Sequence, residues 1–218
     1  MVRLLVSGAT ATIRAELRAQ PERAEAHLGH LLTPHNGNDI AALLETGLPI
    51  GCDNACFGGL DEPALVRMLT RLMPYAQDIL WCSPPDVVAD HRATLRLFGR
   101  YVGLIGWAGI QPAFVAQDGC EPIAGVPWGE IRCLFLGGST AWKLGADAER
   151  LIREAKRRGK WVHIGRVNSM RRLAHFDALG ADSFDGSQFS MFPTTYIPRY
   201  LDRLTYRQRG LLERRRVA

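Results

Sequence analysis

The feature of this sequence that most constrains its fold is a regular alternation of short apolar runs with windows of helical apolar spacing. Eight runs are apolar over most of their length and rich in β-branched or aromatic residues. They cover residues 3–9, 27–34, 48–54, 78–84, 112–119, 133–139, 161–167 and 181–187. Strands that are apolar almost throughout, each followed by a helix, are typical of a parallel sheet covered on its faces.

Eight strand–helix units predict an α/β fold, a compact (β/α)8 TIM barrel. The chain of 218 residues lies near the lower end of the about 200 to 400 residues typical of that fold. A hydrophobic content of 47% is enough for a full core, and no Pro/Gly/Ser-rich linker divides the chain. We therefore expect a single barrel domain over residues 1–218, with an open doubly wound sheet as the alternative.

Helix start and stop signals support this assignment. Asp61 is predicted to cap a helix with Pro63 at an early position, and Ser169 to cap a helix that ends at Gly180. Gly159 is predicted to end the helix before the seventh strand. The expected buried stripe of the helix after Asp61 consists of Leu65, Val66, Met68, Leu69, Leu72 and Met73.

Charge and cysteine content limit the partners and the compartment. The formal net charge is +5, which suits an acidic partner. The 5 cysteines show no zinc-site spacing, so we expect reduced thiols in a cytoplasmic protein. The first residues contain only a short apolar run flanked by charges, so no signal peptide and no membrane association are expected.

Polar residues follow the predicted strands on the side where barrels carry their chemistry. They are Asp53, Asp86, Gln117, the Gly137–Gly138 pair and Asp185. Each also has an ordinary explanation, since Asp is favoured in turns and caps, a Gly pair permits a tight turn, and a strand histidine such as His163 is usually a core residue. Their coincidence at one face favours an active site. Asp185 has no adjacent Lys or Arg, so we expect an unpaired carboxylate there, whereas Asp182 is the more structural acid.

Several of these segments, in order, resemble the tRNA-guanine transglycosylases. "LPIGCDNACF" is similar to the family's T-D-S-G-G-F/Y-Q segment, "VAQDG" to V-Q-G-G and "LFLGGSTAWK" to A-I-G-G-L-x-V-G-E. "HIGRVNSMRRLAHFDALGADSFDGS" is similar to M-G-V-G-T-P-x-D-L…G-x-D-M-F-D-C. "SPPDVVADHRATL" and the form "DSFDGS", with Gly186 in place of a cysteine, more closely resemble the DpdA-like, DNA-modifying branch. The resemblance spans about residues 48–187 and implies the same barrel.

This resemblance implies a base-exchange reaction, in which guanine in a polynucleotide is replaced by a 7-deazaguanine. The aspartate of the family's M-F-D-C segment falls on Asp185, which would be the nucleophile, and Asp53 would be the general acid and base. Asn54 would make polar contacts beside Asp53. Phe57 and Ile164 would enclose the two faces of the flipped base.

The resemblance also implies residues that bind the edges of the base. Asp86 would accept hydrogen bonds from guanine N1–H and its amino group, with Asp90 as the alternative residue. Gln117 and the backbone N–H groups of the turn at Gly137, Gly138 and Ser139 would bind O6. Lys143 replaces the family's V-G-E glutamate, which predicts a neutral incoming base such as 7-cyano-7-deazaguanine (preQ0) rather than a cationic one.

The zinc-binding Cys-x-Cys-x-x-Cys…His insert of the tRNA enzymes is missing, so no metal and no cofactor are expected, and DNA is favoured over RNA as the polymer. The terminal segment contributes Arg207, Arg209, Arg214, Arg215 and Arg216, which could bind phosphates or simply form a solvated helix end. The expected setting is the cytoplasm of a bacterial or phage-infected cell, with a homodimer or a DNA-opening partner protein as open possibilities. The alternatives are an RNA-guanine transglycosylase, a non-catalytic nucleic-acid-binding subunit and a metal-dependent barrel hydrolase; the sequence lacks a clear ligand cluster for the last.

Overall fold

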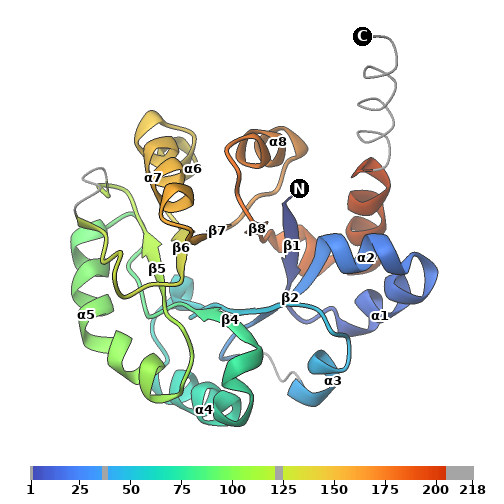
Figure 1. Cartoon of the computed structure of the whole chain (residues 1–218), viewed down its shortest axis with the longest axis horizontal. Coiled ribbons are helices and arrows are strands. Elements are labelled where there is room, and N and C mark those ends of the chain that lie inside the picture. The colour runs from blue at the N-terminus through green and yellow to red at the C-terminus, as the bar shows by residue number, and fades with distance from the viewer. Residues whose placement is uncertain (1, 36–38, 121–124, 205–218) are drawn as a thin grey trace.

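The chain forms a (β/α)8 barrel, in which a ring of parallel strands is surrounded by helices (Figure 1). The computed structural model describes residues 2–35, 39–120 and 125–204. Its eight strands follow the order β4-β3-β2-β1-β8-β7-β6-β5, and every paired neighbour is parallel. The predicted barrel is confirmed, and the open doubly wound sheet is excluded.

All eight predicted strands are present, each shorter than its apolar run. They are β1 (Arg3–Val6), β2 (Leu28–Leu32), β3 (Ile50–Cys52), β4 (Ile79–Cys82), β5 (Ala113–Ala116), β6 (Cys133–Leu136), β7 (Trp161–Ile164) and β8 (Ser183–Phe184). The ring closes between β4 and β5 through one isolated parallel bridge, Cys82 to Pro112. At that point the Cys82 N–H donates to the Gln111 carbonyl at 2.9 Å.

Side chains inside the ring form a small core of their own. Its buried members are Leu5, Leu31, Trp81, Ala113, Val115, Cys133 and Phe135. These strand positions carry odd numbers, and even-numbered neighbours such as Leu4, Phe114 and Ile164 pack outward against the helices, because successive side chains on a strand point to opposite faces. A Cβ on Gly51 would lie 2.7 Å from the Trp81 ring, so this glycine makes room for the largest interior side chain.

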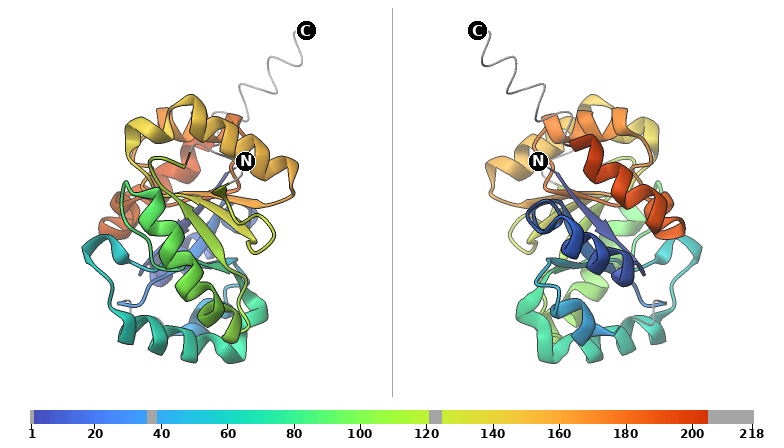
Figure 2. Two further views of the ribbon diagram at one scale, coloured as in Figure 1. Left: turned by 90° about the vertical axis from the view of Figure 1, so that its left-hand side faces the viewer. Right: turned by 90° about the vertical axis from the view of Figure 1, so that its right-hand side faces the viewer.

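The helices lie outside the strands, as the left view of Figure 2 shows for α5 in green. They are α1 (Thr10–Ala19), α2 (Pro21–His27), α3 (Ile40–Leu44), α4 (Glu62–Leu72), α5 (His91–Trp107), α6 (Thr140–Lys143), α7 (Ala146–Arg157), α8 (Met170–Ala178) and α9 (Ser187–Met191), with the 3-10 turns η1 (Cys56–Gly58) and η2 (Met73–Asp78). Residues 193–204 are also helical, and the Tyr200 hydroxyl donates to the Val2 carbonyl at 2.8 Å, which ties this segment to the first strand.

The predicted helix boundaries are confirmed in their physical detail. The side chains of Asp61 and Ser169 accept hydrogen bonds from backbone N–H groups in the first turns of α4 and α8. Gly159 and Gly180 follow helix ends with φ of +66° and +87°, a conformation that favours glycine. The predicted stripe of α4 is wrong at its edges, because Val66 and Met73 are 36% and 38% exposed.

No helix among the described residues is long and apolar enough to cross a membrane.

The same substitution at two glycines should change stability in opposite directions. Gly51→Ala places a methyl against Trp81 and should lower the free energy of unfolding by about 1 to 3 kcal/mol. Gly103→Ala lies in α5, where no atom is within 4 Å of the added carbon. It should raise the free energy of unfolding by about 0.5 to 1 kcal/mol through helix propensity. Urea unfolding of both variants measures the difference, and equal effects would contradict the packing argument.

Candidate active site

A cleft opens at the carboxyl ends of the strands, where the sequence places its acids. It holds about 450 Å³ of empty space, part of which is open solvent at its mouth. Its lining consists of Asp53, Asn54, Ala55, Cys56, Phe57, Asp86, Val88, Val115, Gln117, Phe135, Gly137, Gly165, Arg166 and Asp185. The structure thus brings together seven of the predicted site residues, from the ends of β3, β4, β5, β6 and β8.

Asp185 follows β8 and is not the unpaired carboxylate that the sequence predicts. Its Oδ2 accepts from His163 Nε2 at 3.0 Å, and its Oδ1 accepts from the Arg166 backbone N–H at 3.0 Å. The absence of a basic neighbour in the sequence is therefore misleading, because the partners come from β7 and the loop after it. The side chain stays 17% exposed at the cleft.

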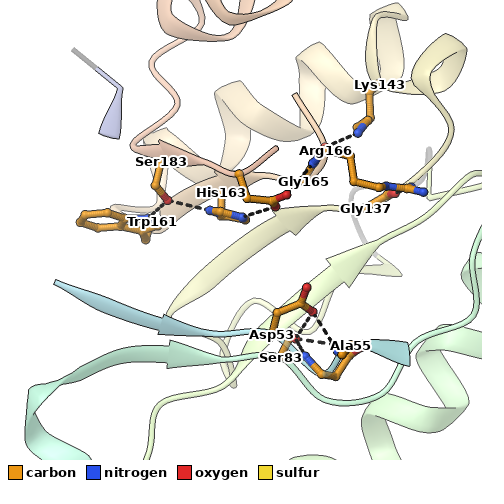
Figure 3. Close-up of polar contacts among 12 residues, drawn as sticks. Asp53, Ala55, Ser83, Gly137, Lys143, Trp161, His163, Gly165, Arg166 and Ser183 are labelled. Atoms are coloured by element: carbon orange, nitrogen blue, oxygen red, sulfur yellow. Dashed lines mark hydrogen bonds and ion pairs between the residues drawn. The ribbon is translucent and has the colours of Figure 1, made fainter. Parts of the chain in front are cut away.

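His163 belongs to a buried chain of polar groups beneath Asp185. Its Nδ1 lies 2.8 Å from Ser183 Oγ, which also accepts from Trp161 Nε1 at 2.7 Å. Figure 3 shows Trp161, Ser183 and His163 in a row on one side of the barrel. The prediction that His163 is a satisfied core residue is correct about its burial but misses its contact with Asp185.

Asp53 faces the same cleft from the opposite side of the barrel, beside Ser83 and Ala55 (Figure 3). Its Oδ1 accepts long hydrogen bonds from the Ser83 hydroxyl and the Ala55 N–H, each at 3.4 Å. Burial raises the pKa of Asp53 to about 7, and the negative charges of Asp185 and Asp86 act in the same direction. Near neutral pH this carboxyl group can therefore both give and take a proton.

Asp86 is bracketed by two side-chain amides. Asn54 Nδ2 donates to its Oδ1 at 2.8 Å, and Gln117 Nε2 donates to its Oδ2 at 2.6 Å. Burial raises the pKa of Asp86, although these hydrogen bonds oppose the rise. Asp90, the alternative candidate, instead caps α5 by accepting from the Ala93 N–H at 2.9 Å. The acid in the cleft is thus Asp86, and Gln117 supports it while its Oε1 accepts from the Ala89 N–H.

Arg166 is the cation of the cleft, and sequence reasoning did not identify it. Its Nη2 donates to the Gly137 and Gly138 carbonyls, and its guanidinium lies 5.3 Å from the centre of the Phe57 ring. Its φ of +58° is in the left-handed region, which is strained for a side chain of this kind. The predicted base-stacking residue Phe57 is 75% exposed at the cleft, and the Arg166 guanidinium lies over one face of its ring.

Two predicted binding elements are not arranged as predicted. Ile164 is fully buried in the layer between strands and helices, because its position on β7 points outward; Gly165 lines the cleft instead. In the turn after β6, the Gly137 and Gly138 N–H groups donate to the Ala116 carbonyl.

Ser139, the third residue of that turn, is also engaged within the protein. Its N–H and hydroxyl both donate to the Asp118 carboxylate at 2.6 Å, and its Oγ caps α6. The prediction that these N–H groups bind a base oxygen is therefore not met in this structure.

Lys143 also lies outside the cleft lining. Its Nζ donates to the Gly165 carbonyl behind the loop, as Figure 3 shows, and the side chain is buried. Burial lowers the pKa of Lys143 to about 8, with the charge of Arg166 acting in the same direction. The predicted contact of Lys143 with the incoming base is corrected, and the positive charge at the cleft belongs to Arg166.

The remaining residues of the β8 motif have structural roles. Asp182 accepts from Lys156 Nζ at 2.6 and 2.7 Å and from the Val162 N–H at 2.7 Å, which confirms its structural role. A Cβ on Gly186 would lie 2.5 Å from the Val167 carbonyl oxygen. Local packing alone therefore excludes a larger residue at position 186, whatever polymer the protein binds.

A second groove is formed by segments that follow Arg166 and Asp185 in the sequence. It is lined by Asn168, Ser169, Met170, Gln188, Phe189, Tyr196, Arg199, Tyr200 and Arg203. The predicted arginines at 207, 209, 214, 215 and 216 lie outside the described residues. Within those residues, no group of three or more His, Cys, Asp or Glu side chains is placed to hold a metal ion.

Comparisons with known proteins identify the fold. No family model and no curated protein matches the sequence. Among solved structures, a chain of the tryptophan synthase complex from Pyrococcus furiosus is 14% identical with a TM-score of 0.52, over 93% of this chain and 95% of that one. The HpcH/HpaI aldolase from Desulfitobacterium hafniense DCB-2 is 9% identical with a TM-score of 0.51, over 93% and 92%. The chain spans about half of an L-talarate dehydratase from Polaromonas sp. JS666, 52% of its length, with 16% identity and a TM-score of 0.46.

The raised pKa of Asp53 should appear in the pH dependence of stability. Folding takes up a proton between the unfolded pKa near 4 and the folded pKa of about 7, so the wild type should lose stability as pH rises through that window. Asp53→Asn removes the titration and should be more stable than the wild type at pH 8, by about 2 kcal/mol after allowance for solvent screening, and similar to it below pH 4.

Urea unfolding from pH 4 to 8 measures this difference. Asp202→Asn is the matched control, because Asp202 is an exposed carboxylate far along the chain from the cleft. Asp202→Asn should follow the wild type over the whole range, whereas Asp53→Asn should become more stable than the wild type as the pH rises. A parallel pH dependence for wild type and Asp53→Asn would contradict the raised pKa.

Proposed function

We propose that this protein is a DNA-guanine transglycosylase, a glycosyltransferase that exchanges guanine in DNA for a 7-deazaguanine base. The observation that supports it most is a pair of carboxylates facing one cleft in two different environments. Asp185 accepts hydrogen bonds on both oxygens, whereas Asp53 has a pKa of about 7. Two carboxyl groups in such different environments can act as the nucleophile and as the general acid and base of one reaction.

In the first half of the reaction, an Asp185 oxygen attacks C1′ of the target nucleotide. A bond forms between that oxygen and C1′, and the bond from C1′ to the base nitrogen breaks. Its electron pair leaves with the guanine, which takes a proton from the Asp53 carboxyl group. The products are a covalent glycosyl-aspartyl intermediate, free guanine and an ionised Asp53.

The second half reverses these steps with a different base. The ring N–H of the incoming 7-deazaguanine gives its proton to Asp53, and the nitrogen attacks C1′. The bond to Asp185 breaks and its carboxylate is released. Two displacements retain the configuration at C1′, and Asp53 ends with the proton with which it began.

Base recognition in this proposal rests on Asp86. Each of its oxygens accepts one amide hydrogen and keeps a further lone pair, so the group can accept from the N1–H and amino group of guanine. Asn54 and Gln117 hold the carboxylate and need not touch the base. Phe57 offers an exposed ring on which the base stacks.

The choice of a polynucleotide rests on the sequence resemblance and on charge. Arg199 and Arg203 line the second groove and offer positive charge to the phosphates of a polynucleotide. DNA is favoured over RNA because the segment "SPPDVVADHRATL" more closely resembles the DNA-modifying branch of the family. RNA remains an arm of the test.

An exchange assay tests the proposal directly. The protein is incubated with radiolabelled 7-cyano-7-deazaguanine and either duplex DNA, single-stranded DNA or tRNA, and the label in the polymer is counted. Wild type should label DNA, and Asp185→Asn should reduce labelling by at least about 1000-fold. Asp182→Asn is unsuitable as a control because that residue holds β7, so Asp202→Asn serves instead and should keep full activity. Labelling of tRNA alone would replace DNA by RNA, and labelling of neither polymer would defeat the proposal.

Arg166 predicts which 7-deazaguanine is used. A guanidinium at the cleft opposes a cationic aminomethyl base and tolerates a neutral cyano base. Arg166→Gln should therefore raise the relative kcat/KM for the aminomethyl base by about 10-fold, measured by competition between the two labelled bases. Lys143→Gln, outside the cleft lining, should leave that ratio unchanged. If Lys143→Gln changes the ratio and Arg166→Gln does not, Lys143 determines the choice of base and the prediction is wrong.

A further inference from the structure

We propose that His163 is a positioning residue for Asp185: Ser183 and Trp161 hold it as the neutral Nε2–H tautomer, and its N–H fixes the carboxylate that attacks the sugar. The catalytic part of this inference rests on the proposed function. The tautomer and the contact with Asp185 do not, so they can be tested in the free protein.

The direction of the hydrogen bonds from Trp161 through Ser183 to His163 determines the tautomer of the His163 ring. The Trp161 indole N–H can only donate, and it donates to Ser183 Oγ at 2.7 Å. The Ser183 hydroxyl hydrogen is then free to be donated to His163 Nδ1 at 2.8 Å, which leaves the ring proton on Nε2. That proton points at Asp185 Oδ2, 3.0 Å away. Every hydrogen in the row finds an acceptor only in this arrangement.

The other protonation states leave a group unsatisfied. A proton on Nδ1 alone would turn the Nε2 lone pair toward the negative Asp185 oxygen. In a doubly protonated ring, His163 Nδ1–H would donate to Ser183 Oγ, which already accepts from Trp161. The Ser183 hydroxyl hydrogen would then lose the His163 nitrogen as its acceptor. Both Ser183 and His163 are fully buried, so water cannot supply the missing partner, and an unmet polar hydrogen there costs about 1 to 3 kcal/mol.

Packing fixes the ring in the plane that makes this contact. The imidazole lies edge-on to Phe135, with ring centroids 4.5 Å apart, and 4.9 Å from the centroid of Trp81. Both neighbours belong to the barrel interior, and neither can move without disturbing the core. His163 therefore presents Nε2–H to one spot, as a backbone N–H would.

Two donors from one segment then define the carboxylate. His163 contacts Oδ2 and the Arg166 N–H contacts Oδ1, so the Asp185 side chain cannot rotate without losing both bonds. A neutral donor orients the carboxylate without cancelling its charge, which a Lys or Arg in the same place would do. The proposed nucleophile is thereby held in one orientation at the cleft, as preorganised sites require.

Two variants separate positioning from packing. His163→Leu fills the space without a donor, and His163→Gln keeps an N–H within reach of Asp185. If positioning is correct, Leu lowers the single-turnover rate at which the covalent intermediate forms by about 100-fold at unchanged KM for the polynucleotide, and Gln restores that rate to within about 10-fold of wild type. Equal loss in both variants, with equal urea midpoints, would overturn the inference. Asp185→Asn sets the baseline.

Nuclear magnetic resonance tests the same contact without activity. In protein labelled with 15N-histidine, His163 should show the neutral Nε2–H tautomer at pH 7, and the Asp185 carboxyl 13C resonance should shift in His163→Leu and return in His163→Gln. A Nδ1–H or doubly protonated His163, or an unmoved Asp185 signal, would overturn the inference. If the wild type labels no polymer, the proposed function fails, and these signals alone decide whether His163 holds Asp185.

Discussion

The two-residue period of its short parallel strands is the constraint on which the rest of this structure depends. Each strand sends alternate side chains into the ring, and the odd-numbered positions supply that interior. The same alternation of side chains continues past the carboxyl ends of the strands, beyond the last hydrophobic layer. It brings Asp53, Gln117 and Asp185 into one cleft with the glycines at 137 and 165. Core and site are thus successive layers of a single pattern, and a strand that slipped by one residue would lose both.

This constraint also explains how far the sequence could predict the molecule. The eight strands, the caps at Asp61 and Ser169 and the strand-end acids follow from local patterns, and all are present. Applied consistently, strand alternation would have placed His163 inside the ring with Trp161 and would have excluded Ile164 from the cleft. Arg166 could not be predicted, because its position depends on a positive φ and on carbonyls from another strand. For the same reason the sequence could not reveal that Asp185 has partners.

The three acids of the cleft lie in three different environments, which allows three carboxyl groups to share one small region. Asp185 accepts two N–H groups at 3.0 Å, and Asp86 accepts two side-chain amides. Burial and the negative charges of the other two acids raise the pKa of Asp53 to about 7, so it is the acid that can hold a proton near neutrality. Loss of the Asp185 or Asp86 carboxylate would therefore lower the pKa of Asp53, so a single substitution here acts beyond its own position.

The closure of the ring between β4 and β5 has a consequence for how the cleft responds to an occupant. The strands themselves share one bridge there, and the contacts just above it are made by side chains: Asp86, which follows β4, accepts from Gln117, which follows β5. The backbone adds a further contact, from the His91 N–H to the Asp118 carbonyl. A ligand that competes with Gln117 for Asp86 weakens this contact between the ends of β4 and β5. Ligand binding and the strength of the contact between β4 and β5 are therefore linked, so a ligand of the cleft should change how readily the barrel opens at this closure.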